Sequence, residues 1–346
     1  MLKINNRRYI GNKTKLLEEI LQSVPSNYNP KDTTFADLFA GTGSVAMYFS
    51  ERNFKTIVND TLYSNYVSYM AWLSGLEYNS AVVDYYLDYY NQLEYSSIES
   101  NYFSDIYADK YFSINDAKKI GYIREHLETI RTTITKREYY ILLASLIYAA
   151  DKIANTVGHF EYFLKNKPND SDFKMESLEI NDKLSSVIYN CDANSLVRRI
   201  KCDIAYIDPP YNARQYVNFY HVLENLARWE KPTVFEGNSM KFKRDELKSG
   251  YSRSEAPVLF ADLIRNLDCK FLIVSYNNTY NAKSAASNNK ISENEIIEIL
   301  STKGKVSKKE INYKSFNAGK TDFKEHKEFI YTCEVQKWNF WIFIKK

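Results

Sequence analysis

Residues 34–44 of this 346-residue chain, TFADLFAGTGS, carry its clearest fold signal. Their first six residues predict a strand, the two glycines predict a turn, and residues 45–52 predict a helix. Residues 56–58 predict the next strand, which ends in Asn59 and Asp60. A strand, a glycine turn, a helix and a second strand ending in an acid are typical of one half of a nucleotide-binding α/β sheet.

The glycine turn predicts a ligand site. The turn is not GxGxxG, and no lysine follows it as in a P-loop, which disfavours a pyrophosphate ligand. Asp37 suits a cation such as an amino-acid ammonium, and Asp60 suits ribose hydroxyls. Asp192 follows a strand predicted at residues 186–191 and suits an adenine amino group. Each acid alone is as readily a helix N-cap or a solvated strand end, but the three together predict S-adenosylmethionine.

A second informative stretch is Asp208-Pro209-Pro210-Tyr211, which follows an apolar strand predicted at residues 204–207. The two prolines lack backbone N–H groups and end the strand. The turn therefore presents a carboxylate, exposed carbonyls and an aromatic ring at a strand end, where open α/β sheets bind ligands. Two fixed acceptors suit the amino group of a flat heterocycle, on which the tyrosine could stack. Taken alone, the same residues are equally a plain turn.

The middle of the chain breaks the α/β alternation. Residues 63–93 and 136–163 predict helices, separated by a stretch rich in Ser, Asn and Asp. Residues 271–275 predict a further strand, and residues 329–334 with 338–344 predict an antiparallel hairpin. The sequence thus predicts a catalytic α/β domain at residues 1–62 and 185–346, interrupted by a mainly helical inserted domain at residues 63–184.

Composition sets few further limits. A net charge of +3 permits a polyanionic partner without arguing for one. The four cysteines show no CxxC or Cys/His spacing, so we expect no metal site and a reduced cytoplasmic setting. The sequence has no signal-peptide pattern and no apolar run long enough to cross a bilayer, so we expect no membrane partner.

These motifs together resemble the α-class, Dam-like DNA N6-adenine methyltransferases of the type II restriction-modification group. Residues 8–13, RYIGNK, are similar to the family's N-terminal motif, residues 37–44 to its glycine motif, and Asp208–Tyr211 to its catalytic DPPY turn. The order of these motifs around an insert is specific to that class. Residues 150–158 and 214–216, with Tyr220 and His221, resemble the type II modification enzymes more weakly.

The resemblance implies a Rossmann-like methyltransferase sheet and a helical target-recognition insert. It implies methyl transfer from S-adenosylmethionine, without a metal, to N6 of an adenine flipped out of duplex DNA, leaving S-adenosylhomocysteine. The implied catalytic residues are Asp208, Pro209, Pro210 and Tyr211. The cofactor-binding residues that we expect are Tyr9, Lys13, Asp37, Phe39, Ala40, Gly41, Thr42, Gly43, Ser44, Asp60, Asp192 and Ala193.

Contacts with the DNA backbone should come from basic and amide side chains near the cleft. The candidates are Arg214, Gln215, Lys152, Lys241, Lys243 and Arg244, with Lys165 and Lys167 as further possibilities. Taken singly, each charged candidate is more readily a solvated surface residue than a DNA contact. Arg214 and Gln215 are favoured because they follow the catalytic turn by only three and four residues.

Three other functions remain open at this point. The same chemistry could methylate N4 of cytosine, although the family's cytosine enzymes usually carry Ser in place of Asp208. An RNA N-methyltransferase also uses an Asp-Pro-Pro-Tyr turn but generally lacks the insert. A DNA-binding specificity protein with a vestigial cofactor fold is disfavoured by the intact motifs. We expect a monomer in a prokaryotic cytoplasm, with any cognate restriction endonuclease acting separately.

Overall fold

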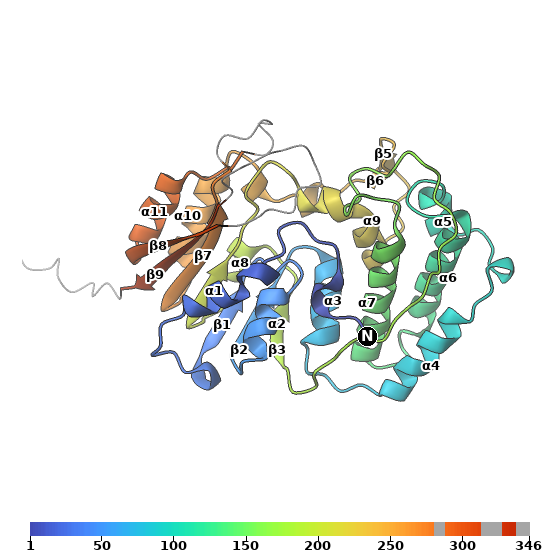
Figure 1. The fold of residues 1–346 in the computed structure, drawn as a ribbon, viewed down its shortest axis with the longest axis horizontal. Coiled ribbons are helices and arrows are strands. Elements are labelled where there is room, and N and C mark those ends of the chain that lie inside the picture. The colour runs from blue at the N-terminus through green and yellow to red at the C-terminus, as the bar shows by residue number, and fades with distance from the viewer. Residues whose placement is uncertain (280–287, 313–326, 337–346) are drawn as a thin grey trace, which may run out of the picture.

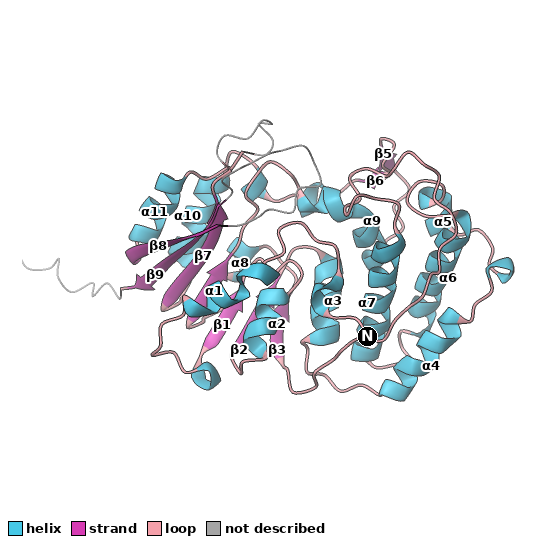
Figure 2. Cartoon of the chain, viewed as in Figure 1, coloured by secondary structure: helices cyan, strands magenta, loops and turns pink. Residues whose placement is uncertain are grey.

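The computed structural model describes residues 1–279, 288–312 and 327–336. Within these ranges the main sheet has seven strands in the order β3-β2-β1-β4-β7-β9-β8. Figure 2 shows this sheet in one half of the molecule and a group of helices in the other. The strands are β1 (Thr34–Asp37), β2 (Lys55–Asn59), β3 (Ser186–Tyr189), β4 (Ile204–Ile207), β7 (Phe271–Asn277), β8 (Gly304–Asn312) and β9 (Lys327–Val335). The predicted Rossmann-like α/β sheet is confirmed.

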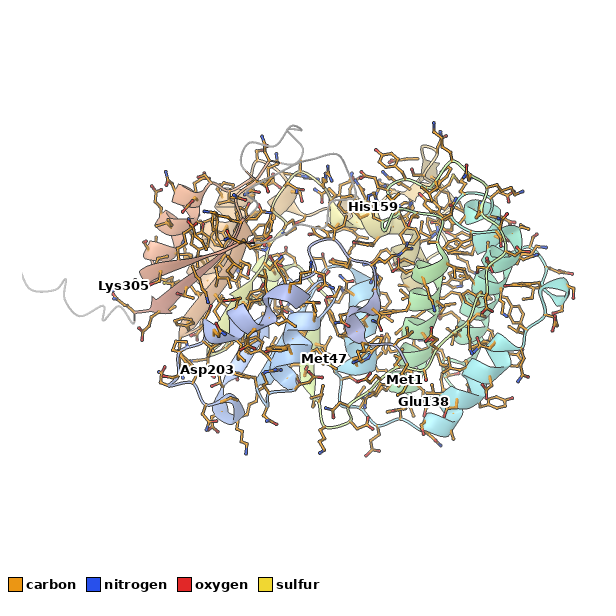
Figure 3. The ribbon with its side chains drawn as sticks, viewed as in Figure 1. Met1, Met47, Glu138, His159, Asp203 and Lys305 are labelled. Atoms are coloured by element: carbon orange, nitrogen blue, oxygen red, sulfur yellow. The ribbon has the colours of Figure 1, made fainter. Side chains whose placement is uncertain are left out.

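The strand order reverses between β1 and β4. The chain leaves β1 for β2 on one side and leaves β4 for β7 on the other, while β1 and β4 pair in parallel, with Asp37 opposite Tyr206. Ligands bind at such a switch point, beyond the carboxyl ends of the strands. Asp203, labelled in Figure 3, lies at the other end of the strands. It accepts the Thr34 N–H at 2.8 Å and pairs with Lys270 at 2.7 Å.

Both faces of the central strands β1 and β4 are buried. Phe35 and Tyr206 pack on the face covered by α1 (Leu17–Gln22) and α2 (Ser44–Ser50). Ala36 and Ile207 face the opposite layer of α8 (Ala193–Leu196), α10 (Ala256–Asn266) and α11 (Glu293–Ser301). Successive side chains on a strand point to opposite faces, which explains why these strands read as continuous apolar runs.

The predicted C-terminal hairpin is present but has a different first strand. Residues 329–334 lie in β9, as expected. Along its length β9 pairs antiparallel with β7 on one side and with β8 on the other. The hairpin is therefore β8–β9, and the predicted pairing of residues 329–334 with 338–344 is wrong; residues 338–344 lie outside the described part of the chain.

A helical body stands beside the sheet (Figure 1). It comprises α3 (Tyr63–Trp72), α4 (Ser80–Asn91), α5 (Tyr102–Tyr107), α6 (Ile114–Ile130), α7 (Lys136–Ile153) and α9 (Tyr216–Arg228), with the small ribbon of β5 (Phe235–Glu236) and β6 (Lys241–Phe242) above α9. The helix predicted over residues 63–93 is divided into α3 and α4, and that over 136–163 ends at Ile153. Residues 216–242, which follow the Asp-Pro-Pro-Tyr turn, thus join the same body as residues 63–153.

Two polar contacts fix the start of α3 and the N-terminal segment on the rest of the helical body. Glu224 of α9 is fully buried and accepts the backbone N–H groups of Tyr63 and Ser64 at 2.8 and 2.9 Å, which caps the start of α3. Asp151 of α7 accepts the Arg8 N–H at 2.9 Å, and thereby holds the N-terminal segment. In the described residues, no helix is long and apolar enough to span a membrane.

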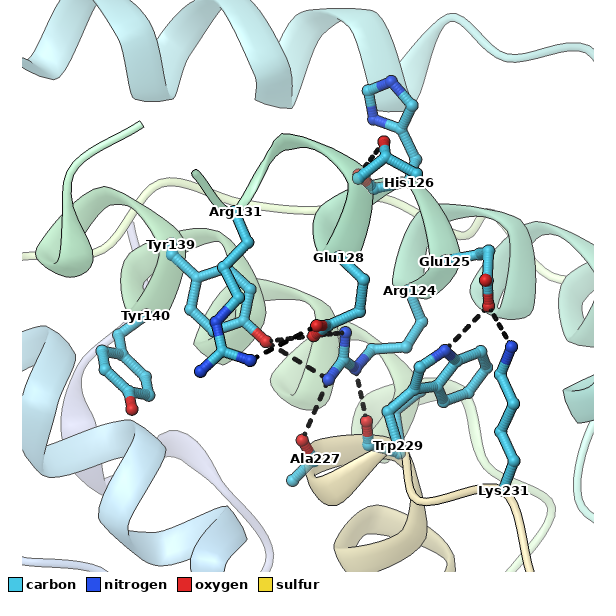
Figure 4. A network of polar contacts seen from close by, with 12 residues as sticks. Arg124, Glu125, His126, Glu128, Arg131, Tyr139, Tyr140, Ala227, Trp229 and Lys231 are labelled. Carbon is cyan, nitrogen blue, oxygen red and sulfur yellow. Dashed lines mark hydrogen bonds and ion pairs between the residues drawn. The ribbon is translucent and has the colours of Figure 1, made fainter. Parts of the chain in front are cut away.

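A buried arginine ties three helices of this body together (Figure 4). Arg124 of α6 donates to the carbonyls of Leu226 and Ala227 at the end of α9, at 2.7 and 3.1 Å. It also pairs with Glu128 at 2.6 Å and donates to the Tyr139 hydroxyl of α7 at 3.2 Å. The last carbonyls of a helix need such donors, so Arg124 fixes where α9 ends.

Replacing Arg124 should therefore destabilise the fold. We expect Arg124→Met to lower the free energy of unfolding by about 3 kcal/mol, because it leaves two buried helix-end carbonyls without their donor and removes the nearest charge partner of Glu128. Arg131→Met is the matched control, since Arg131 also pairs with Glu128, at 3.4 Å, but its side chain is 56% exposed. That variant should lose less than about 1 kcal/mol. Equal losses in urea unfolding would contradict this assignment.

Candidate active site

A cavity of 430 Å³ lies at the carboxyl ends of the parallel strands, at the switch point. Acids that end or follow four of these strands line it: Asp37, Asp60, Asp192 and Asp208. The other predicted site residues among its lining groups are Tyr9, Lys13, Phe39, Ala40, Gly41, Thr42, Ser44, Ala193, Pro210 and Gln215. Within the described part of the chain, Gly43, Pro209 and Tyr211 are not among them.

The glycine turn needs its glycines for space as well as for backbone conformation. Gly41 and Gly43 adopt φ values of 54° and 81°, which side chains disfavour. A Cβ atom on Gly41 would lie 3.0 Å from the Tyr9 ring, and one on Gly43 would lie 2.9 Å from Ile4 and from the Tyr69 ring. Gly43 therefore lets α2 begin against the core rather than lining the cavity itself.

Asp60 fixes the turn from the neighbouring strand. Its carboxylate accepts the Gly41 N–H at 2.9 Å and the Leu62 N–H at 2.8 Å. Burial raises the pKa of Asp60 to about 6, although these donors favour the ionised form. Asn59, one residue earlier, donates to the carbonyls of Leu38 and Cys191, both at 3.1 Å, so the ends of three strands are held together.

Asp37 is a buried carboxyl group without a charged partner among the described residues. Only 1% of the residue is exposed, and neither of its oxygens has a side-chain hydrogen-bond partner among the described residues. Burial raises the pKa of Asp37 well above its usual range, and the charges of Asp208 and Asp60 raise it further. A buried carboxylate is costly unless it is paired, so a cationic ligand group in the cavity would stabilise its ionised form.

Asp208 of the catalytic turn is paired with the N-terminal segment. The Lys13 ammonium lies 2.9 Å from Asp208 Oδ2, and only 8% and 13% of the two side chains are exposed. The Tyr211 hydroxyl donates to Asp208 Oδ1. Burial raises the pKa of Asp208, whereas the Lys13 charge and these hydrogen bonds lower it. Lys13, which we predicted as a cofactor ligand, lines the cavity but directs its charge at Asp208.

Tyr211 is held behind the turn. Its ring packs on that of Tyr276, with centroids 4.5 Å apart, and its carbonyl accepts from the Lys290 N–H at 2.8 Å and the Tyr276 hydroxyl at 3.2 Å. With its hydroxyl bonded to Asp208, the tyrosine acts on the carboxylate in this arrangement. The contacts with Tyr276, Lys290 and Asp208 already fix the Tyr211 ring. The predicted stacking of this ring on a flat ligand stays a prediction.

Asp192 is both a helix N-cap and a residue of the cavity wall, the two roles considered from the sequence. Its carboxylate accepts the Ser195 N–H at 2.9 Å, which makes it the N-cap of α8, and it also lines the cavity. The N-cap bond uses one carboxylate oxygen and leaves acceptor capacity on the cavity side.

Two of the predicted DNA contacts have other roles. The Arg244 guanidinium is buried and donates to Asn218 Oδ1 at 2.8 Å and to the Phe242 carbonyl at 2.7 Å, so in this structure it supports the β5–β6 ribbon. The Gln215 amide is bonded to the backbone of Ser249. Lys152 pairs with Glu176 at 3.0 Å on the surface.

The other predicted DNA contacts are basic residues of the β5–β6 ribbon and of the segment after the Asp-Pro-Pro-Tyr turn. Lys241 is half-buried, with its ammonium 5.8 Å from the Tyr162 ring centroid. Arg214 and Lys243 are exposed. Burial lowers the pKa of His159, and the positive charges of Arg214 and Lys241 contribute to this. Arg214 and Lys241 are therefore both near His159, although they are far apart in the sequence.

Sequence reasoning missed several groups that line the cavity. Residues 246–251 form part of its wall, as do Asn12, Asn190 and Tyr216. Tyr216 stacks on Tyr9 with centroids 5.6 Å apart. No motif marks residues 246–251 in the sequence, and only the tertiary fold brings them to the cavity. Among the described residues, no group of three or more His, Cys, Asp or Glu is arranged to hold a metal ion.

The sheet topology and the acid-lined cavity at its switch point are those of a ligand-binding α/β fold, with the buried Asp208 carboxylate in the cavity wall. A family model described as D12 class N6 adenine-specific DNA methyltransferase matches residues 9–267. The chain belongs to this family.

Three relatives illustrate the similarity. Modification methylase StsI of Streptococcus sanguinis is 37% identical over 90% of this chain and 49% of its own length. Modification methylase LlaI of Lactococcus lactis subsp. lactis is 37% identical over 78% of this chain and 46% of its own length. Type II methyltransferase M.NlaIII of Neisseria lactamica is 32% identical over 92% of this chain and 95% of its own length. The chain thus spans about half the length of the first two relatives and nearly all of the third.

The Lys13–Asp208 pair predicts a shift in pH dependence. If activity needs ionised Asp208, it is lost as the pH falls through the pKa of that carboxyl. Lys13→Met removes the charge that lowers this pKa, so the loss should begin at a higher pH. We expect kcat/KM at pH 6 to fall about tenfold or more below wild type, with a smaller gap at pH 9.

The control is Lys15→Met, which removes the same charge from an exposed residue two positions along the chain. Its pH profile should match wild type. An unchanged acid limb in Lys13→Met would show that Lys13 does not govern Asp208.

Proposed function

We propose that this protein methylates N6 of adenine in duplex DNA, using S-adenosylmethionine. The observation that carries the proposal is the buried Asp208 carboxylate, held by Lys13 and Tyr211 at the end of β4 beside an acid-lined cavity. The family description supports adenine as the base. The modification methylases among the relatives support a role in restriction-modification.

The carboxylate groups that line the cavity fit S-adenosylmethionine. Asp37 would hold the ammonium, Asp60 the ribose hydroxyls and Asp192 the adenine amino group, with the glycine turn allowing close approach. The buried Asp37 carboxyl group, which has no side-chain partner among the described residues, supports the first assignment. The volume of 430 Å³ lies within the range of small-molecule sites, about 300–1,000 Å³. The bound cofactor supplies an activated methyl group on a sulfonium.

The chain's own residues would prepare the target nitrogen. The lone pair of an adenine amino group is delocalised into the ring, which makes the nitrogen a poor nucleophile. Asp208 and the Pro209 carbonyl would each accept one amino N–H, which stabilises the positive charge that develops on the nitrogen. Lys13 favours the ionised, accepting form of Asp208. Holding the base in line with the methyl group supplies the remaining acceleration.

We assign target recognition to the helical body. The base must leave the duplex to reach the cavity, and the body stands beside the cavity with Arg214, Lys241 and Lys243 as candidate phosphate contacts. The predicted insert of residues 63–184 is extended in this proposal by α9 and the β5–β6 ribbon, because these pack on it. A role in restriction-modification would place the protein with cellular DNA in a prokaryotic cytoplasm. We further propose a monomer that acts separately from any endonuclease.

The test is transfer of isotope-labelled methyl groups to duplex DNA by Asp208 variants. Asp208→Ala should lower the rate by about 10³-fold or more, while Kd for S-adenosylhomocysteine changes less than about fivefold, since the lost acceptor serves the reacting nitrogen. Asp208→Asn keeps one acceptor oxygen and the side-chain volume, so it should retain slightly more activity.

A matched reaction with RNA of the same sequence is the control for substrate class. Wild-type turnover by Asp208→Ala, or faster transfer to RNA than to duplex DNA, would contradict the proposal.

A further inference from the structure

The residues directly behind the catalytic turn are bonded to a wall of the cavity. Gln215 Nε2 donates to the Ser249 carbonyl at 3.0 Å, and Gln215 Oε1 accepts the Ser249 N–H at 2.7 Å. Ser252 Oγ donates to the Arg214 carbonyl at 3.1 Å. We call these three hydrogen bonds the Gln215 clamp. They join segments that are 34 and 38 residues apart in sequence.

One side of the clamp belongs to the cofactor end of the cavity. Residues 246–251 line the cavity. The Tyr251 ring packs edge-on against Phe39, with centroids 5.1 Å apart, and its hydroxyl donates to Asn194 Oδ1 at 2.8 Å. Phe39 precedes the glycine turn, and Asn194 lies two residues after Asp192. Residues 246–251 are therefore fixed against the groups that we assign to S-adenosylmethionine.

The other side of the clamp belongs to the groups that would meet DNA. Gln215 is the N-cap residue of α9, and α9 is part of the helical body. Arg214 follows the catalytic Asp208 by six residues. The clamp thus connects residues 246–251 of the cavity wall with the first residues of the helical body.

We propose that Gln215 is a positioning residue that couples cofactor binding to DNA binding, rather than a residue that reads bases; this rests on the function proposed above. Both polar atoms of its amide already bond Ser249, so a base would have to compete with two good hydrogen bonds. A cofactor that packs against residues 246–251 stabilises the clamp, and the clamp holds Arg214 and the start of α9 in place. Linkage then requires that DNA tighten cofactor binding by the same factor.

Binding measurements without turnover test this proposal. Titration calorimetry gives Kd for S-adenosylhomocysteine, and fluorescence anisotropy gives Kd for a duplex that carries the target site, with and without S-adenosylhomocysteine. In wild type, the product should tighten DNA binding about fivefold or more. Gln215→Met keeps the side-chain length but breaks two bonds, so Kd for S-adenosylhomocysteine should rise about tenfold. The tightening of DNA binding by S-adenosylhomocysteine should shrink to about twofold.

Ser252→Ala is the matched variant, because it breaks the third bond of the clamp without touching Gln215. It should change the same two quantities in the same direction, by about two- to fivefold. Weaker cofactor-free DNA binding by Gln215→Met, with unchanged binding of S-adenosylhomocysteine, would overturn the proposal and make Gln215 a DNA contact. Absence of coupling in wild type would also overturn it. A wild-type protein that does not bind S-adenosylhomocysteine would instead contradict the proposed function itself.

Discussion

An ammonium–carboxylate pair, Lys13 with Asp208, holds the N-terminal segment against the catalytic turn, and the rest of the site is arranged around it. Both side chains are almost fully buried. Burial disfavours an ionised carboxylate, and the opposing charge at 2.9 Å offsets this. Because the site also contains Asp37 and Asp60, the lysine charge counters like-charge repulsion among several acids. Breaking such a pair leaves a buried charge without compensation.

The position of Lys13 in turn depends on the helical body. Arg8, five residues earlier, is held by Asp151 at the end of α7, and Tyr9 stacks on Tyr216 and Tyr220 of α9. Arg124 fixes the end of α9, and Glu224 of the same helix caps α3. The catalytic carboxylate and the body that we assign to DNA recognition are therefore connected through a short N-terminal segment. This arrangement gives a physical route by which DNA contacts could influence the cavity.

The parts of the site that the sequence could predict are those with local geometry. The glycine turn and the Asp-Pro-Pro-Tyr turn each place their groups at a strand end, and the strand order then gathers four acids at one edge. The partner of Lys13 could not be predicted, because it lies 195 residues away (208 − 13). An arginine is usually expected on the surface, but Arg244 is buried beside the β5–β6 ribbon. Residues 329–334 carry a strand pattern, yet a pattern does not name the partner strand, so β8 was missed.

The identity of the methylated nucleoside tests the central claim most directly. Duplex DNA from a strain without adenine or cytosine methylation would be incubated with the protein and S-adenosylmethionine, digested to nucleosides and measured by mass spectrometry. The account predicts N6-methyladenine, absent from a parallel reaction with Asp208→Ala. N4-methylcytosine would contradict the assignment of the base while leaving the geometry of the cavity in place. No methylated nucleoside, from a protein that binds S-adenosylhomocysteine, would contradict duplex DNA as the substrate.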